Sequence, residues 1–89
     1  MKEIVEQAKA QLMMIEQIYG LKIINRDDMA GLIAANVDND RQVLTICSLL
    51  NSWILLNKKK GEVVIPLDVL LRLFETPKGR GNMHKQAGK

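Results

Sequence analysis

The sequence predicts a mainly α-helical domain with a small β-hairpin. Two amphipathic helical patterns, over about 26–35 and 40–52, flank a short polar connector at 36–39. Two runs of strand-forming residues follow, separated by a basic turn that contains a glycine. Only three of the 89 residues are aromatic, so the core must consist mainly of Leu, Ile, Val and Met, which favours helices over a β-sandwich. The order helix, turn, helix, hairpin is that of a winged helix-turn-helix.

A first helix is predicted over 3–19, where apolar residues recur at steps of three and four and form one stripe. Gly20 follows directly and can adopt the left-handed conformation that ends a helix. The stripe is wider than one neighbouring element needs, so it predicts either packing inside this domain or a dimer or partner surface. Its residues are Ile4, Ala8, Leu12, Ile15 and Tyr19. The apolar run 21–24 is expected to pair with the later strands.

The connector at 36–40 is the sharpest break in the chain, because Asn and Asp favour turns and helix caps. Asn25 is expected to cap the helix at 26–35, and Asp38 or Asn39 the next helix. That helix has an apolar face and an opposite face of Arg, Gln, Thr and Ser, which can read base edges in a DNA major groove. Any exposed helix face is also polar, so both interpretations stay open. The candidate base-contacting residues are Asn39, Arg41, Gln42, Thr45 and Ser48.

The predicted hairpin pairs the run 53–56 with the run 62–65 around a basic tip. As a wing, Lys58, Lys59 and Lys60 would lie beside phosphates and add salt-dependent affinity that does not depend on base sequence. Lysines at a hairpin tip also prevent edge-to-edge aggregation, which is the alternative explanation. A last helix over 66–75 is expected to close a domain of residues 1–76, followed by a disordered basic tail at 77–89.

Residues 25–74 resemble the DNA-binding domain of the cyclic-AMP receptor protein family. Ala30 and Ala34 stand where that family carries an Ala and, four residues later, a Gly. The apolar steps of its recognition helix and wing are matched by Val43, Ile46, Leu50, the pair Leu55-Leu56 and the segment up to Ile65. The resemblance implies a winged helix that binds DNA, with Arg41 and Thr45 contacting bases.

The sequence also departs from that family. Ala34 replaces the turn glycine, and about three extra residues separate the two helices. The Ser-Arg-Glu-Thr run that opens the family's recognition helix is absent, since residues 39–42 read Asn-Asp-Arg-Gln. These differences are compatible with a winged-helix scaffold that binds a protein instead of DNA.

Basic charge is concentrated at one end of the chain. Residues 77–89 contain four basic and no acidic residues, whereas residues 1–76 contain nine basic and ten acidic ones, a net charge of −1. A DNA-binding domain usually has a broad basic face, so the near-neutral body also fits a helical protein-interaction module. In that alternative the first helix, or the methionines Met13, Met14 and Met29, contacts a partner protein.

Catalysis is not predicted. With one His, one Cys and no Gly-rich phosphate loop, the chain offers no set of residues for an enzyme, a metal or a cofactor. Cys47 is expected to be a buried small hydrophobe, and the acidic pairs lie at helix starts, where capping explains them. The lone cysteine and the absence of a signal-peptide pattern predict a cytoplasmic protein. The most apolar stretch, 43–56, is too short and too polar to cross a membrane.

The favoured hypothesis is therefore a dimeric DNA-binding protein, a transcriptional regulator or a replication or partition accessory. The helix at 40–52 would read DNA and the three lysines would contact phosphates. A dimer would place two such helices about one DNA turn, ~34 Å, apart.

Overall fold

The computed structural model describes residues 2–75 and, for residue 2, the backbone only. The fold is mainly helical, with one small sheet. The elements in chain order are α1 (Lys2–Tyr19), β1 (Lys22–Ile23), α2 (Arg26–Ala35), α3 (Asp40–Leu56), β2 (Glu62–Val63) and α4 (Leu67–Glu75). The prediction of a mainly α-helical domain is confirmed at this level. The predicted disordered tail at 77–89 lies outside the described residues.

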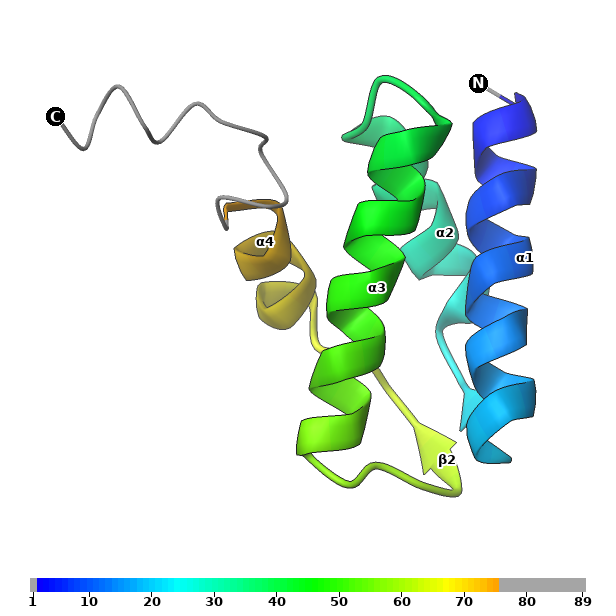
Figure 1. Cartoon of the computed structure of the whole chain (residues 1–89), viewed down its shortest axis with the longest axis vertical. Coiled ribbons are helices and arrows are strands. Elements are labelled where there is room, and N and C mark those ends of the chain that lie inside the picture. The colour runs from blue at the N-terminus through cyan, green and yellow to red at the C-terminus, as the bar shows by residue number, and fades with distance from the viewer. Residues whose placement is uncertain (1, 76–89) are drawn as a thin grey trace, which may run out of the picture.

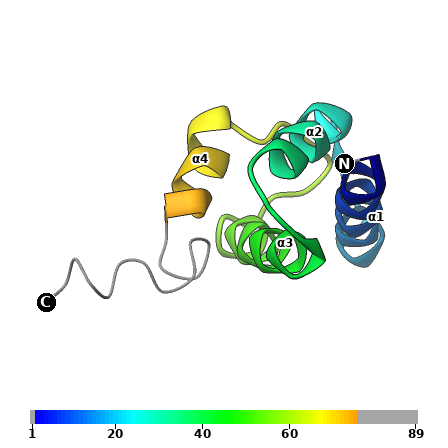
Figure 2. The same cartoon turned by 90° about the horizontal axis from the view of Figure 1, so that it is seen from above.

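The helices surround one core. α1 and α3 lie side by side and run in the same direction, with α2 behind them and α4 on the side of α3 away from α1 (Figures 1 and 2). The apolar stripes of these helices meet in the middle, where large side chains lose essentially all contact with solvent. The most buried of them are Leu12, Ile23, Ile33, Val43, Ile46, Leu50, Ile54, Ile65 and Leu70. Burial of this area drives the helices together, because it removes apolar surface from water.

The sheet joins segments that are far apart in the sequence. β1 and β2 are parallel, with Lys22 opposite Glu62 and Ile23 opposite Val63. The expectation that residues 21–24 pair with a later strand is confirmed. The Asn25 side chain continues this pairing, because Nδ2 donates to the Ile65 carbonyl (2.9 Å) and Oδ1 accepts from the Ile65 N–H (3.0 Å). Asn25 is the N-cap residue of α2, as predicted, and its carbonyl accepts from the Met29 N–H, but its side chain makes no capping hydrogen bond.

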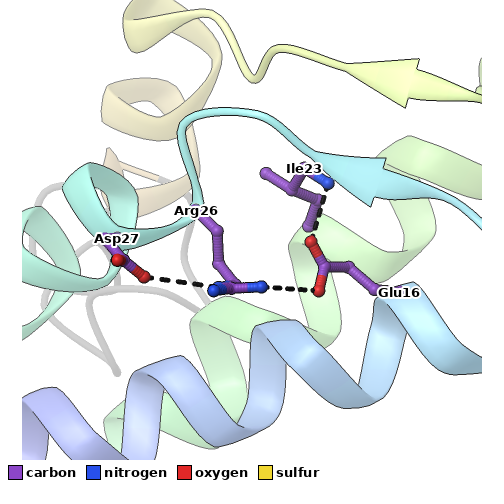
Figure 3. Close-up of polar contacts among 4 residues, drawn as sticks. All are labelled: Glu16, Ile23, Arg26 and Asp27. Atoms are coloured by element: carbon purple, nitrogen blue, oxygen red, sulfur yellow. Dashed lines mark hydrogen bonds and ion pairs between the residues drawn. The ribbon is translucent and has the colours of Figure 1, made fainter.

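A carboxylate of α1 holds β1 in place (Figure 3). Glu16 Oε2 accepts from the Ile23 N–H at 2.7 Å, and Oε1 accepts from Arg26 Nη1 at 2.9 Å. Arg26 Nε also donates to Asp27 Oδ1 at 3.3 Å. The hydrogen bond to Glu16, followed by that to Asp27, raises the pKa of Arg26 above its ordinary value. The side chain of Glu16 is only 12% exposed. This one half-buried carboxylate accepts from the backbone of β1 and from the side chain of Arg26, the first residue of α2.

The predicted hairpin is wrong. Residues 53–56 belong to α3, which runs to Leu56, and the only strand after them in the described residues is β2, paired with β1. Helical spacing explains the difference. Ile54 is 1% exposed and continues the buried stripe one turn after Leu50, whereas Leu55 is 58% exposed. A wing built as a hairpin is therefore not formed by residues 53–65.

The end of α3 requires an unusual lysine conformation. The Lys58 N–H donates to the Leu55 carbonyl and the Lys59 N–H donates to the Ile54 carbonyl, both at 3.1 Å. These two bonds form a Schellman motif, whose left-handed position is normally a glycine. Lys58 occupies that position with φ of 53° and is the only non-glycine residue with positive φ among those described. Gly20, with φ of 64°, ends α1 as predicted.

Replacing Lys58 with glycine is expected to raise the free energy of unfolding by about 1 kcal/mol, because glycine adopts left-handed conformations without the Cβ penalty. Urea denaturation of Lys58→Gly against the parent chain measures this. Lys60→Gly is the matched control, since Lys60 does not have positive φ, and it should give no gain. An equal gain at both positions would show that the left-handed conformation of Lys58 is not the cause.

Candidate functional site

The predicted base-contacting residues at the start of α3 have structural partners. Asn39 is the N-cap, and its side-chain oxygen accepts from the Gln42 N–H at 3.0 Å. The Gln42 side-chain oxygen accepts in turn from the Asp38 N–H. These two bonds satisfy N–H groups at the helix start. Asn39 and Gln42 therefore stabilise the N-terminal end of α3 through their side-chain oxygens.

The remaining three candidates lie one turn apart on α3. Arg41 and Ser48 are exposed, and Thr45 is half-buried. The Thr45 hydroxyl donates to the Arg41 carbonyl at 3.1 Å, within the helix. Of the five predicted base-contacting side chains, Arg41 and Ser48 are therefore the two that are exposed and take no part in the helix cap.

The three lysines lie far from Arg41. They follow the C-terminal end of α3, whereas Arg41 stands in its first turn, and a 17-residue helix is about 25 Å long. All three lysines are exposed, and Lys59 Nζ lies 5.3 Å from the centroid of the Trp53 ring. The major groove is ~12 Å wide, so on bound DNA Arg41 and the three lysines would make contacts more than one groove width apart.

The predicted dimer stripe is largely internal. Ile4, Ala8, Leu12 and Ile15 are buried in the core of their own chain, and Tyr19 is half-buried against it. Packing inside the domain explains this stripe, and its four buried members are not available to a partner. Met29 is also buried, so it does not join Met13 and Met14 on the surface.

A different surface of α1 and α3 is exposed and apolar. A groove of about 190 Å³ runs between the two helices, with Ile15 and Cys47 as its buried members. Met14, Ile18 and Leu44 line it and are 49%, 64% and 46% exposed. The polar residues at the groove are Gln11, Ser48 and Asn51. We call the surface members Gln11, Met14, Ile18, Leu44, Ser48 and Asn51 the α1–α3 face; Gln11 and Asn51 are half-buried and the other four are exposed.

The α1–α3 face carries no formal charge. The 15 residues from 42 to 56 contain no Asp, Glu, Lys or Arg, although the whole chain is 26% charged and would give about four. Ser48, Ser52, Leu55 and Leu56 in this stretch are nevertheless exposed. A solvated helix face usually carries charges, so this run was the signal in the sequence that could have identified the surface.

Cys47 offers no chemistry at the groove. The prediction that it is buried is confirmed, since its exposure is 3%. Burial raises the pKa of the Cys47 thiol from 9.0 to about 12. The thiolate is the reactive form of cysteine, so this thiol is inert at neutral pH.

Within residues 2–75, none of the helices has the length and apolar character needed to cross a membrane. No family model matches the sequence, and neither a curated protein nor a solved structure shows significant similarity to it.

Proposed function

We propose that this chain is a protein-interaction module that binds through its α1–α3 face. The observation that carries the proposal is the combination of Met14, Ile18 and Leu44, each about half exposed or more, around a groove without formal charge. Exposed apolar side chains gathered around one groove on a small domain mark a surface that is covered in the functional state.

The composition of the α1–α3 face supports a protein partner. The centre of a protein–protein interface is depleted of charged residues and enriched in Met and other large side chains, with polar groups at its rim. Met14 and Ile18 supply apolar area on α1, and the flexible thioether of methionine adapts to the shape of a partner. Ser48 and Asn51 supply hydrogen-bonding groups at the edge.

The proposal can be tested by placing a photo-crosslinking amino acid at position 44 in cells that produce the protein. We expect an ultraviolet-dependent adduct with a polypeptide, identified by mass spectrometry. Position 71 is the matched control, because Leu71 is also leucine and, at 45%, equally exposed, but lies on α4. Adducts of equal yield at both positions, or none at 44, would contradict an interface at the α1–α3 face.

DNA binding is a second candidate. It is favoured by the exposure of Arg41 and Ser48 on α3 and of the lysines at 58–60. Anisotropy of a labelled duplex with the full chain and with a chain ending at residue 76, at low and near-physiological salt, tests it. This candidate is supported if the shorter chain binds DNA in a salt-sensitive way and if Arg41→Ala weakens that binding. Binding by the full chain alone would assign DNA affinity to residues 77–89 instead.

A further inference from the structure

We propose that the partner of the α1–α3 face is a second copy of this chain, bound as an antiparallel two-fold dimer. This inference rests on the proposed function of that face and names its occupant. Two properties of the structure favour a second copy: the chemistry of the groups at the middle of the face, and the distribution of charge at its two ends.

The middle of the face is self-complementary. In a two-fold interface, a residue near the symmetry axis meets its own copy, so a charged group there would be repelled. Ser48 is the midpoint of α3, and Gln11 lies at the middle of α1. Hydroxyl and amide groups each contain a donor and an acceptor, so Ser48 can hydrogen-bond Ser48 of the second copy and Gln11 can bond Gln11. Neither a lysine nor a carboxylate could do so.

The surface beyond one end of the α1–α3 face is acidic. Glu3, Asn39 and Asp40 line a common surface depression, so the N-terminal ends of α1 and α3 lie together (Figure 1). Four exposed carboxylates gather at this end: Glu3, Glu6, Asp38 and Asp40. Among the described side chains, the exposed Arg41 and the half-buried Lys9 offset only part of this charge.

The surface beyond the other end of the α1–α3 face is basic. The Lys22 N–H donates to the Gly61 carbonyl at 2.8 Å, which brings the segment after α1 to the segment after α3. Four exposed lysines gather there, Lys22, Lys58, Lys59 and Lys60, beside the exposed carboxylate of Glu62. The exposed Asp27 and Asp28 share a depression with Lys22, but they belong to α2, which lies behind α1 and α3 (Figure 1).

These charges select the orientation of the dimer. A two-fold axis can lie in the plane of the interface and run perpendicular to α1 and α3. Rotation about this axis makes each helix antiparallel to the same helix of the second copy. The acidic end of each chain then faces the basic end of the other, at both ends of the interface. An axis along the helices would instead place acidic on acidic and basic on basic, which is electrostatically unfavourable.

The oligomeric state of the purified full chain is the first test. Sedimentation equilibrium in the micromolar range is expected to show twice the 10.0 kDa chain mass. Leu44→Lys places two buried charges in each dimer, one from each chain. If each charge raises the dimer dissociation constant about tenfold, the variant should raise it at least about a hundredfold. Leu71→Lys, at an equally exposed leucine on α4, should leave the dimer unchanged. Equal effects of the two variants, or a monomeric parent chain, would overturn the proposal.

Disulfide formation tests the orientation. In a Cys47→Ala background, Ser48→Cys is expected to cross-link two chains, because position 48 lies at the axis. Ser52→Cys, also exposed and one turn further along α3, should not, since its two copies would lie about 12 Å apart along the helix, beyond the reach of a disulfide. Equal cross-linking at both positions would show a parallel arrangement and overturn the antiparallel one.

The dimer and the proposed function can fail separately. A monomeric chain whose position 44 forms an adduct with a different polypeptide overturns the dimer and leaves the interaction module. A monomeric chain with no adduct at position 44 above the position 71 control overturns both. An adduct between two copies, in a chain that sediments as a dimer, supports both.

Discussion

Replacing Asn25 with alanine is expected to lower the free energy of unfolding by about 2–3 kcal/mol. The Asn25 side chain gives both a donor and an acceptor to the backbone of Ile65, 40 residues away. Ile65 is 1% exposed, so its N–H and carbonyl would lose their partners in a region that water does not readily reach. A buried backbone group left without a hydrogen bond carries the full cost of its desolvation.

Urea denaturation followed by circular dichroism measures this loss. Asn36→Ala is the matched control, because Asn36 Nδ2 also donates to a carbonyl, that of Leu32 at 2.8 Å, but is exposed and bonds within its own helix. We expect the control to cost less than about 1 kcal/mol. Equal losses for Asn25→Ala and Asn36→Ala would show that the contact to Ile65 does not stabilise the fold.

The helices were predictable where local signals agree. Gly20 and the polar connector before Asp40 mark helix ends by backbone chemistry that needs no knowledge of the fold. The four residues Trp53–Leu56 gave no such signal, because they suit a strand as well as a helix. Their state was decided by tertiary burial of Ile54 and by a Schellman motif that uses a lysine where glycine is usual.

The candidate site was harder to predict than the fold. Polar residues in the first turn of a helix look the same in sequence whether they cap the helix, as Asn39 does, or contact a ligand. The apolar stripe of α1 was visible, but the sequence could not show which of its residues the other helices cover. Ile15 is buried and Ile18 exposed because α2 and α3 together leave one edge of α1 uncovered. Only the charge-free run at 42–56 was available to identify the α1–α3 face from sequence alone.

Replacing Leu70 with alanine is expected to destabilise the protein by about 2–5 kcal/mol, the usual cost of a Leu→Ala cavity in a core. Leu70 is the one fully buried residue of α4, and α4 packs on α3. Leu67 and Leu71 are about half exposed, so they cannot replace its contacts. Hydrogen exchange should show the greatest loss of protection in residues 67–75, since α4 packs mainly on α3, whereas α1 packs on both α2 and α3.

Leu71→Ala is the control for this prediction. It removes the same atoms from the next position of α4, where the side chain is 45% exposed, and should cost less than about 1 kcal/mol. A uniform loss of protection over α1, α2 and α3 in Leu70→Ala would contradict local undocking of α4 and show that the whole chain unfolds as one unit. If only α4 undocks, the α1–α3 face stays intact, and Leu70→Ala should sediment as the parent chain does. Stability of α4 and association through the α1–α3 face would then be separable properties of the same small domain.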